Sequence, residues 1–136
     1  MWLIYAFLAA VFAALTAVLA KVGLDGINSH LATAIRTVVV LALSWGMVMM
    51  VGSHKEIPDL SRNNYIFLSL SGLCTGLSWL CYYKALQIGQ VSKVAPIDKL
   101  SVVLTIILAA VFLHEPFTAK TLAGCLFLVT GILLLI

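Results

Sequence analysis

Five long apolar runs constrain this chain more than any other feature of its sequence. They cover residues 2–20, 31–51, 65–83, 94–113 and 118–136. About 20 helical residues cross the hydrocarbon core of a bilayer, so each run is long enough to be a membrane span. Lipid offers backbone groups no hydrogen-bond partner, whereas a helix satisfies them internally. The sequence therefore predicts an all-α integral membrane protein with five transmembrane helices.

The charge content excludes several other classes of protein. Only 10% of the residues are charged, whereas a soluble domain usually carries about 25%. The basic residues behind the net charge of +3 are scattered at span ends, where they anchor helices to head groups, so the expected partner is the lipid bilayer and not nucleic acid. The longest connection, residues 52–64, is too short for a further domain, so we expect a single transmembrane domain over residues 1–136.

The sequence has no pattern typical of an enzyme or of a cofactor site. It lacks paired carboxylates, a Ser-His-Asp order, a glycine-rich phosphate loop and a metal-binding cluster. We therefore expect neither catalysis nor a bound cofactor or metal.

The basic residues in the connections set no clear orientation in the membrane. Each side carries three of them: Lys55, Arg62 and Lys120 on the N-terminal side, and Lys21, Lys84 and Lys93 on the other. Orientation normally follows an excess of Lys and Arg on one side. The balance favours insertion in both directions, which would allow two copies to pair head to tail. The alternative is one fixed orientation that these few charges do not reveal.

Arg36 is the first of three charged residues inside the spans. It lies about 8 Å into the second run, and Thr33, Thr37 and Ser44 recur near the same face. A charge at this depth normally faces the bundle or a wet cavity. The alternative is that Arg36 extends to the head groups while the hydroxyls bond their own helix.

The fourth run contains the other two charges, Asp98 and Lys99, shortly after Pro96. Asp98 shares a helix face with Ser101 and Thr105, and these residues are candidates for a polar path. Adjacent residues point about 100° apart on a helix, so we expect Lys99 to contact another helix or a partner chain. Alternatively, Asp98 is a first-turn carboxylate favoured by the helix dipole, and Lys99 lies at the interface.

The third run ends in an aromatic group formed by Trp79, Tyr82 and Tyr83. Their spacing places them on one side of a helix. Trp79 and Tyr83 are candidates for a ligand contact, and Trp79 is the deepest of the group. The alternative is an interfacial aromatic belt.

Glycine pairs suggest close packing between helices. Gly72 and Gly76 form a G-x-x-x-G pair, and Gly124 and Gly131 lie seven residues apart. Small residues let helix backbones approach in lipid, so we expect a closely packed bundle at these positions.

Residues 94–101, residues 113–118, and Gly124 with Gly131 together resemble the EamA family of the drug/metabolite transporter superfamily. The stretch from Gly76 to Leu86 is similar to the third helix of that family. His114 stands where glycine is usual. Family members typically have ten helices in two inverted five-helix repeats, so this chain resembles one repeat.

The resemblance implies a secondary transporter of a small metabolite in the bacterial inner membrane. It also implies that a second, oppositely oriented copy completes the molecule, with the substrate path near the midplane. Arg36, Trp79, Tyr83, Asp98, Lys99 and Ser101 would then line that path. The alternatives are a non-transporting membrane subunit and one half of a heterodimer.

The first run is also similar to that of small multidrug resistance exporters, although it has no acidic residue where they carry a glutamate. Asp98 is the only embedded acid, and Arg36 and Lys99 suggest a preference for anionic or zwitterionic solutes.

Overall fold

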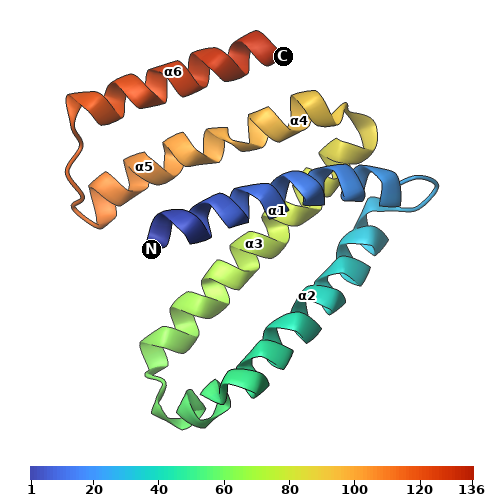
Figure 1. The fold of residues 1–136 in the computed structure, drawn as a ribbon, viewed down its shortest axis with the longest axis vertical. Helices are drawn as coiled ribbons and strands as arrows, with labels where there is room; N and C mark the ends of the chain where they lie inside the picture. Colours follow the sequence, from blue (N-terminus) through green and yellow to red (C-terminus); the bar gives the residue numbers. More distant parts are fainter. The chain divides into compact units, whose positions relative to one another are not determined.

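The computed structural model describes all 136 residues and contains helices but no strands. In chain order the elements are α1 (Trp2–Gly23), α2 (Ser29–Val51), the 3-10 helix η1 (Ser53–Asp59), α3 (Arg62–Ile88), α4 (Val91–Asp98), α5 (Leu100–Phe112) and α6 (Ala119–Leu135) (Figure 1). The all-α prediction is confirmed.

Four helical segments are long and apolar enough to cross a membrane. These are α1, α2, α3 and the stretch Val91–Phe112, which combines α4 and α5. The last helix, α6, is apolar but has 17 residues, or about 25 Å at 1.5 Å per residue. The chain is thus a multi-pass membrane protein, and the count of five spans stays a prediction.

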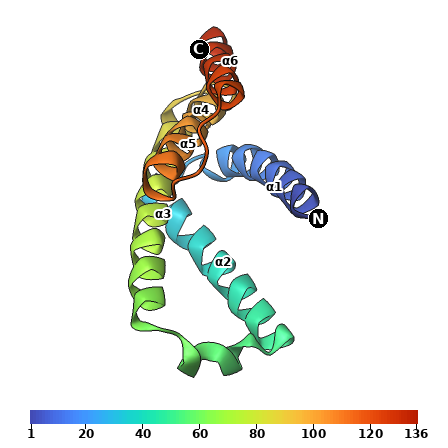
Figure 2. The ribbon, with the colours of Figure 1, turned by 90° about the vertical axis from the view of Figure 1, so that its left-hand side faces the viewer.

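The chain forms two compact units, Leu19–Gln87 and a second unit of Met1–Val18 with Ile88–Ile136. In the first unit, α2 and α3 form an antiparallel hairpin joined through η1. The two helices lie closest where α2 begins and α3 ends, and they separate toward η1 (Figure 2). Gly52 ends α2 with a φ of 83°, and its N–H donates to the Val48 carbonyl. This left-handed conformation costs glycine little because it has no Cβ.

A small core closes the end of this hairpin. Its buried residues are Leu24, Ser29, Thr33, Tyr83 and Leu86. Around them, the Lys21 ammonium donates to the Leu86 carbonyl at 2.6 Å and to the Gln87 carbonyl at 3.5 Å. The Gln87 amide donates in turn to the Ile27 carbonyl at 2.7 Å. The last carbonyls of a helix have no partner within it, so Lys21 satisfies the end of α3 and complements its dipole.

In the second unit, α6 turns back and contacts both α4 and α5 (Figure 1). The Thr118 hydroxyl caps the start of α6 by accepting from the Thr121 N–H at 3.2 Å. At the other end, the Lys93 ammonium donates to the Ile136 carbonyl at 2.9 Å. Cys125 and Ile132 are the buried residues of α6. Polar contacts at both ends therefore fix this helix pair, with little side-chain burial between them.

His114 lies in the turn between α5 and α6 with a φ of 54°. This is the left-handed region, where a side chain other than that of glycine is disfavoured and His, Asn and Asp are among the better tolerated. Glycine adopts a positive φ at little cost, which explains why it is usual at this position in the family that the sequence resembles.

Close packing at the glycine pairs is not found within the chain. A Cβ at Gly72, Gly76, Gly124 or Gly131 would meet no other atom within 4 Å. The expectation of intrachain packing at these positions is therefore wrong. Small residues alone do not bring helices together, because lipid solvates an apolar helix face as well as another helix does.

Replacing Lys21 by Met should destabilise the hairpin of α2 and α3. The change removes a charged donor from the end of α3, and hydrogen bonds to charged groups contribute about 1.5–3 kcal/mol. We expect the free energy of unfolding in detergent to fall by this order, as measured by circular dichroism. The matched control is Lys55→Met in η1, whose ammonium makes no hydrogen bond or ion pair. Equal stability of the two variants would contradict the role given to Lys21.

Candidate functional site

Three of the predicted site residues form one cluster between α2 and α3. The Arg36 guanidinium lies over the Trp79 ring, with its carbon 4.0 Å from the ring centroid. The same carbon is 5.3 Å from the Tyr83 centroid. Both distances lie within the range of cation–π attraction, about 6 Å. The cluster of Arg36, Trp79 and Tyr83 is thus an electrostatic contact between two membrane-spanning helices.

The core at the closed end of the hairpin positions this cluster. Tyr83 is only 3% exposed and belongs to that core together with Thr33. Arg36 follows Thr33 by three residues and Trp79 precedes Tyr83 by four, so each lies one helical turn beyond a buried residue on the same face. Burial of Thr33 and Tyr83 therefore directs Arg36 and Trp79 toward each other.

The Arg36 guanidinium contacts α3 some distance before the end of that helix. Gln87 bonds to Ile27, so the end of α3 and the turn before α2 lie together. Trp79 precedes the end of α3 at Ile88 by nine residues, or about 13 Å along the helix. A charged residue inside a span costs about 2.5–3.5 kcal/mol on insertion scales, and a cation–π contact returns about 0.5–2 kcal/mol.

The hydroxyls near Arg36 are occupied by their own helix. Thr33 donates to the Ser29 carbonyl at 2.9 Å, Thr37 to Thr33 at 2.7 Å and Ser44 to Val40 at 2.8 Å. This is the local bonding considered as the alternative to a polar stripe. Their protons are therefore used within α2, while their oxygens keep acceptor capacity.

Asp98 and Lys99 lie at a break between α4 and α5. Pro96 has no N–H to continue the α-helical pattern, and the Lys99 N–H donates to the Pro96 carbonyl while the Val102 N–H donates to Lys99, both at 3.0 Å. These are bonds of the tighter 3-10 type. The helix begins at Val91 with Gln90 as its N-cap, which places Asp98 about 10 Å inside the span.

Within the chain Lys99 contacts Asp98 and not another helix, and its contact with a partner chain stays a prediction. The Lys99 ammonium lies 3.2 Å from the Asp98 carboxylate, so these two neighbouring residues form an ion pair. A rotation of 100° separates the Cβ directions of adjacent residues, but the flexible four-carbon stem of lysine can fold back to its neighbour. Both side chains are partly exposed. The break therefore carries two opposite charges that neutralise each other.

Ser101, the last predicted site residue, is exposed just beyond the break. Its backbone carbonyl accepts from the Thr105 hydroxyl at 2.8 Å. Asp98, Lys99 and Ser101 thus form a second group, which belongs to the other compact unit of the chain. The structure brings the six predicted residues together as two sets of three.

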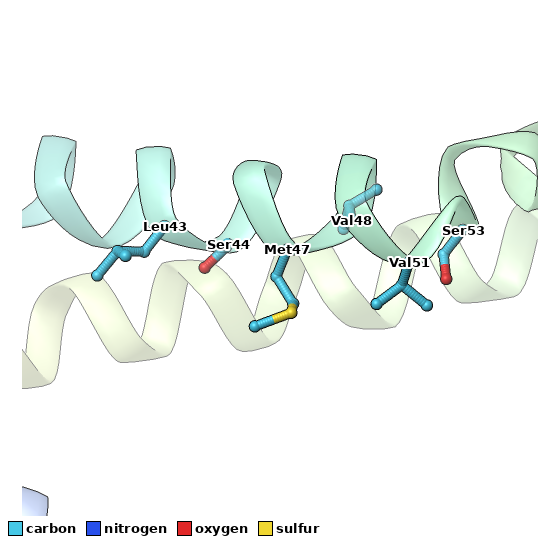
Figure 3. A pocket seen from close by; sticks show the side chains of 6 residues that line it. All are labelled: Leu43, Ser44, Met47, Val48, Val51 and Ser53. Carbon is cyan, nitrogen blue, oxygen red and sulfur yellow. The ribbon is translucent and has the colours of Figure 1, made fainter.

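Two pockets in the Leu19–Gln87 unit involve none of these six residues. One, of about 430 Å³, is lined by Leu43, Ser44, Met47, Val48, Val51 and Ser53. Figure 3 shows Leu43, Met47 and Val51 pointing to the same side of α2. The other, of about 490 Å³, lies at the turn after α1 and is lined by Lys21, Val22, Leu24, Asp25, Gly26 and Gln87.

Sequence reasoning missed the role of Lys21 and Gln87 at the second pocket. A basic residue in the last turn of an apolar helix was the available signal for Lys21, but that pattern is equally typical of a head-group anchor. The acceptor carbonyls come from the end of α3, about 65 residues later in the chain. No local pattern identifies such a partner.

The four helical segments that are long and apolar enough to cross a membrane define a multi-pass membrane protein. The chain matches the EamA-like transporter family over residues 1–136. It is 46% identical over 134 residues to a Sinorhizobium sp protein named "Uncharacterized transporter in cobO 3'region", covering 98% of this chain and 95% of that one. The chain belongs to the EamA-like transporter family.

A second relative is longer. "Uncharacterized transporter YvbV" of Bacillus subtilis (strain 168) is 39% identical over 67 residues, which are 49% of this chain and 22% of that protein. Because the same 67 aligned residues make up 49% of this chain but only 22% of YvbV, YvbV is more than twice as long as this chain. No solved structure matches the chain.

Arg36 and Trp79 should be energetically coupled. In a double-mutant cycle of Arg36→Met and Trp79→Leu, we expect an interaction energy of about 0.5–2 kcal/mol, as is usual for a partly desolvated cation–π pair. The measurement is unfolding of the four proteins in detergent. A cycle that pairs Lys55→Met with Trp79→Leu is the control and should be additive, because Lys55 lies in η1. Additivity in both cycles would contradict the contact.

Proposed function

We propose that this protein is a secondary transporter that moves a small metabolite across the bacterial inner membrane. The observation that carries the proposal is the match to a transporter family over the whole chain, in a protein with charged groups inside its spans. Charges at this depth are costly and normally serve a path or a binding site. Arg36, Trp79 and Tyr83, with Asp98, Lys99 and Ser101, are the side chains assigned to that path.

The working form of the transporter is an antiparallel homodimer of five-span subunits. Two facts support this part of the proposal: a family relative more than twice as long, and the equal number of basic residues in the connections on the two sides. Two oppositely inserted copies would reproduce an inverted repeat, with a shared path near the midplane. Rocking of the two halves around this path would give alternating access.

The purified chain, reconstituted alone into liposomes, should carry a labelled metabolite from a screened panel. Asp98→Asn and Lys99→Met should each lower the flux about tenfold or more, because removing one partner leaves an uncompensated charge in the path assigned to the solute. Lys55→Arg, in η1, is the control and should transport normally, because it keeps the number of basic residues on that side.

Normal flux in both the Asp98 and Lys99 variants would remove these residues from the path. Absence of flux for every solute, together with a stable complex with other proteins, would favour the non-transporting subunit. Flux that appears only after a homologous chain is added would favour a heterodimer.

Reporters fused to the last residue should be found on both sides of the membrane. A cytoplasmic fluorescent reporter and a periplasmic phosphatase should both be active, because three basic residues lie on each side. In the double variant Lys55→Gln, Arg62→Gln, the count becomes one against three, and only the fluorescent fusion should remain active. A single fixed side in the unaltered chain would exclude the antiparallel homodimer.

A further inference from the structure

The Arg36 guanidinium contacts aromatic rings, but its N–H groups have no hydrogen-bond acceptor within the chain. It lies over Trp79 and near Tyr83, and it makes no hydrogen bond or ion pair with another residue of the chain. A guanidinium carries five N–H donors in its own plane. Stacking on a ring leaves those in-plane donors available, in the fork geometry that matches a carboxylate or a phosphate.

The chain supplies no counter-charge for this group. Of its five acidic residues, Asp25, Glu56, Asp59 and Glu115 lie in connections or in η1, and only Asp98 lies within a span. Asp98 is paired with Lys99 at 3.2 Å. Arginine does not lose its proton in proteins, so the Arg36 cluster keeps a net positive charge at membrane depth.

The cluster is also arranged in advance for a ligand. Tyr83 is fixed by burial at the closed end of the hairpin, and the Trp79 ring holds the guanidinium face at 4.0 Å. A side chain held in this way loses little conformational freedom when it binds. The Thr33 and Thr37 hydroxyls are held by hydrogen bonds to their own helix, and neither is bonded to the guanidinium.

We propose, on the basis of the transport function above, that the transported solute carries an oxyanion, a carboxylate or phosphate, which binds to the free edge of the Arg36 guanidinium. The Trp79 and Tyr83 rings hold the face of the same group. An oxyanion here neutralises a charge that is otherwise uncompensated, and it makes charge-assisted hydrogen bonds in a medium of low dielectric constant.

Trp79 emission provides a direct measure of binding that does not depend on flux. The chain has three tryptophans, so the variant Trp2→Phe, Trp45→Phe leaves Trp79 as the single reporter beside Arg36. In detergent free of phospholipid, succinate and inorganic phosphate are the oxyanion probes, and succinamide is the neutral match. We expect saturable changes in emission with at least one oxyanion and none with succinamide.

Arg36 variants in this background identify the group that binds. Arg36→Gln should abolish the response, and Arg36→Lys should weaken affinity about tenfold, because the charge remains but the two-pronged geometry is lost. Lys55→Arg, which keeps the charge balance of the connections, is the control and should bind as the parent does. Equal affinity in the parent and in Arg36→Gln would overturn the proposal.

A lipid head group offers the same chemistry, and vesicles separate the two sources. The reporter variant is placed in phosphatidylcholine vesicles with and without phosphatidylglycerol. A response to phosphatidylglycerol with none to succinate or phosphate would assign Arg36 to lipid and overturn the solute proposal. Retention of the succinate or phosphate response in both vesicles supports it.

Flux measurements distinguish failure of this inference from failure of the transport function. Transport of a neutral solute that is unaffected by Arg36→Gln would leave the transport function standing and would overturn the oxyanion assignment. Arg36-dependent binding of an oxyanion, without flux of any solute, would support the oxyanion site and contradict the proposed transport function.

Discussion

The ammonium of Lys21 on the last carbonyls of α3 is the contact on which the described site depends. It joins the end of α1 to the end of α3, and the Gln87 amide joins the end of α3 to the turn before α2. In a membrane protein the apolar faces gain little from contacting each other, because lipid is equally apolar. Polar contacts at helix ends therefore help to hold the helices together, as a hydrophobic core does in a soluble protein.

This contact leads directly to the Arg36 cluster. Once α2 and α3 are joined at one end, Thr33 and Tyr83 are buried there, and the next helical turn brings Arg36 over Trp79. Farther from the closed end the helices separate (Figure 2), so no equivalent contact is available along the rest of the hairpin. The cluster thus lies in the part of the hairpin where α2 and α3 are close.

The charged residues at the break between α4 and α5 are compensated in a different way from Arg36. Pro96 interrupts the regular hydrogen bonding, and the adjacent residues Asp98 and Lys99 neutralise each other. Arg36, in contrast, is compensated only by the faces of aromatic rings. One unit of the chain therefore contains a neutral pair at a helix break, and the other contains a cation held against aromatic rings.

The sequence by itself determined the all-helical class, the spanning character of its long apolar runs and the residues that are too polar to face lipid without a reason. These follow from local physics, because run length and backbone hydrogen bonding within a helix need no distant partner. It also supplied a specific resemblance to the family to which the chain belongs. Tertiary structure added contacts that the sequence left open: Arg36 lies over Trp79, the hydroxyls bond their own helix, and Lys99 folds back to Asp98. Lys21 and Leu86 are far apart in the chain, and the direction of a long side chain depends on neighbours that helical periodicity does not specify, so only the folded chain could show these contacts.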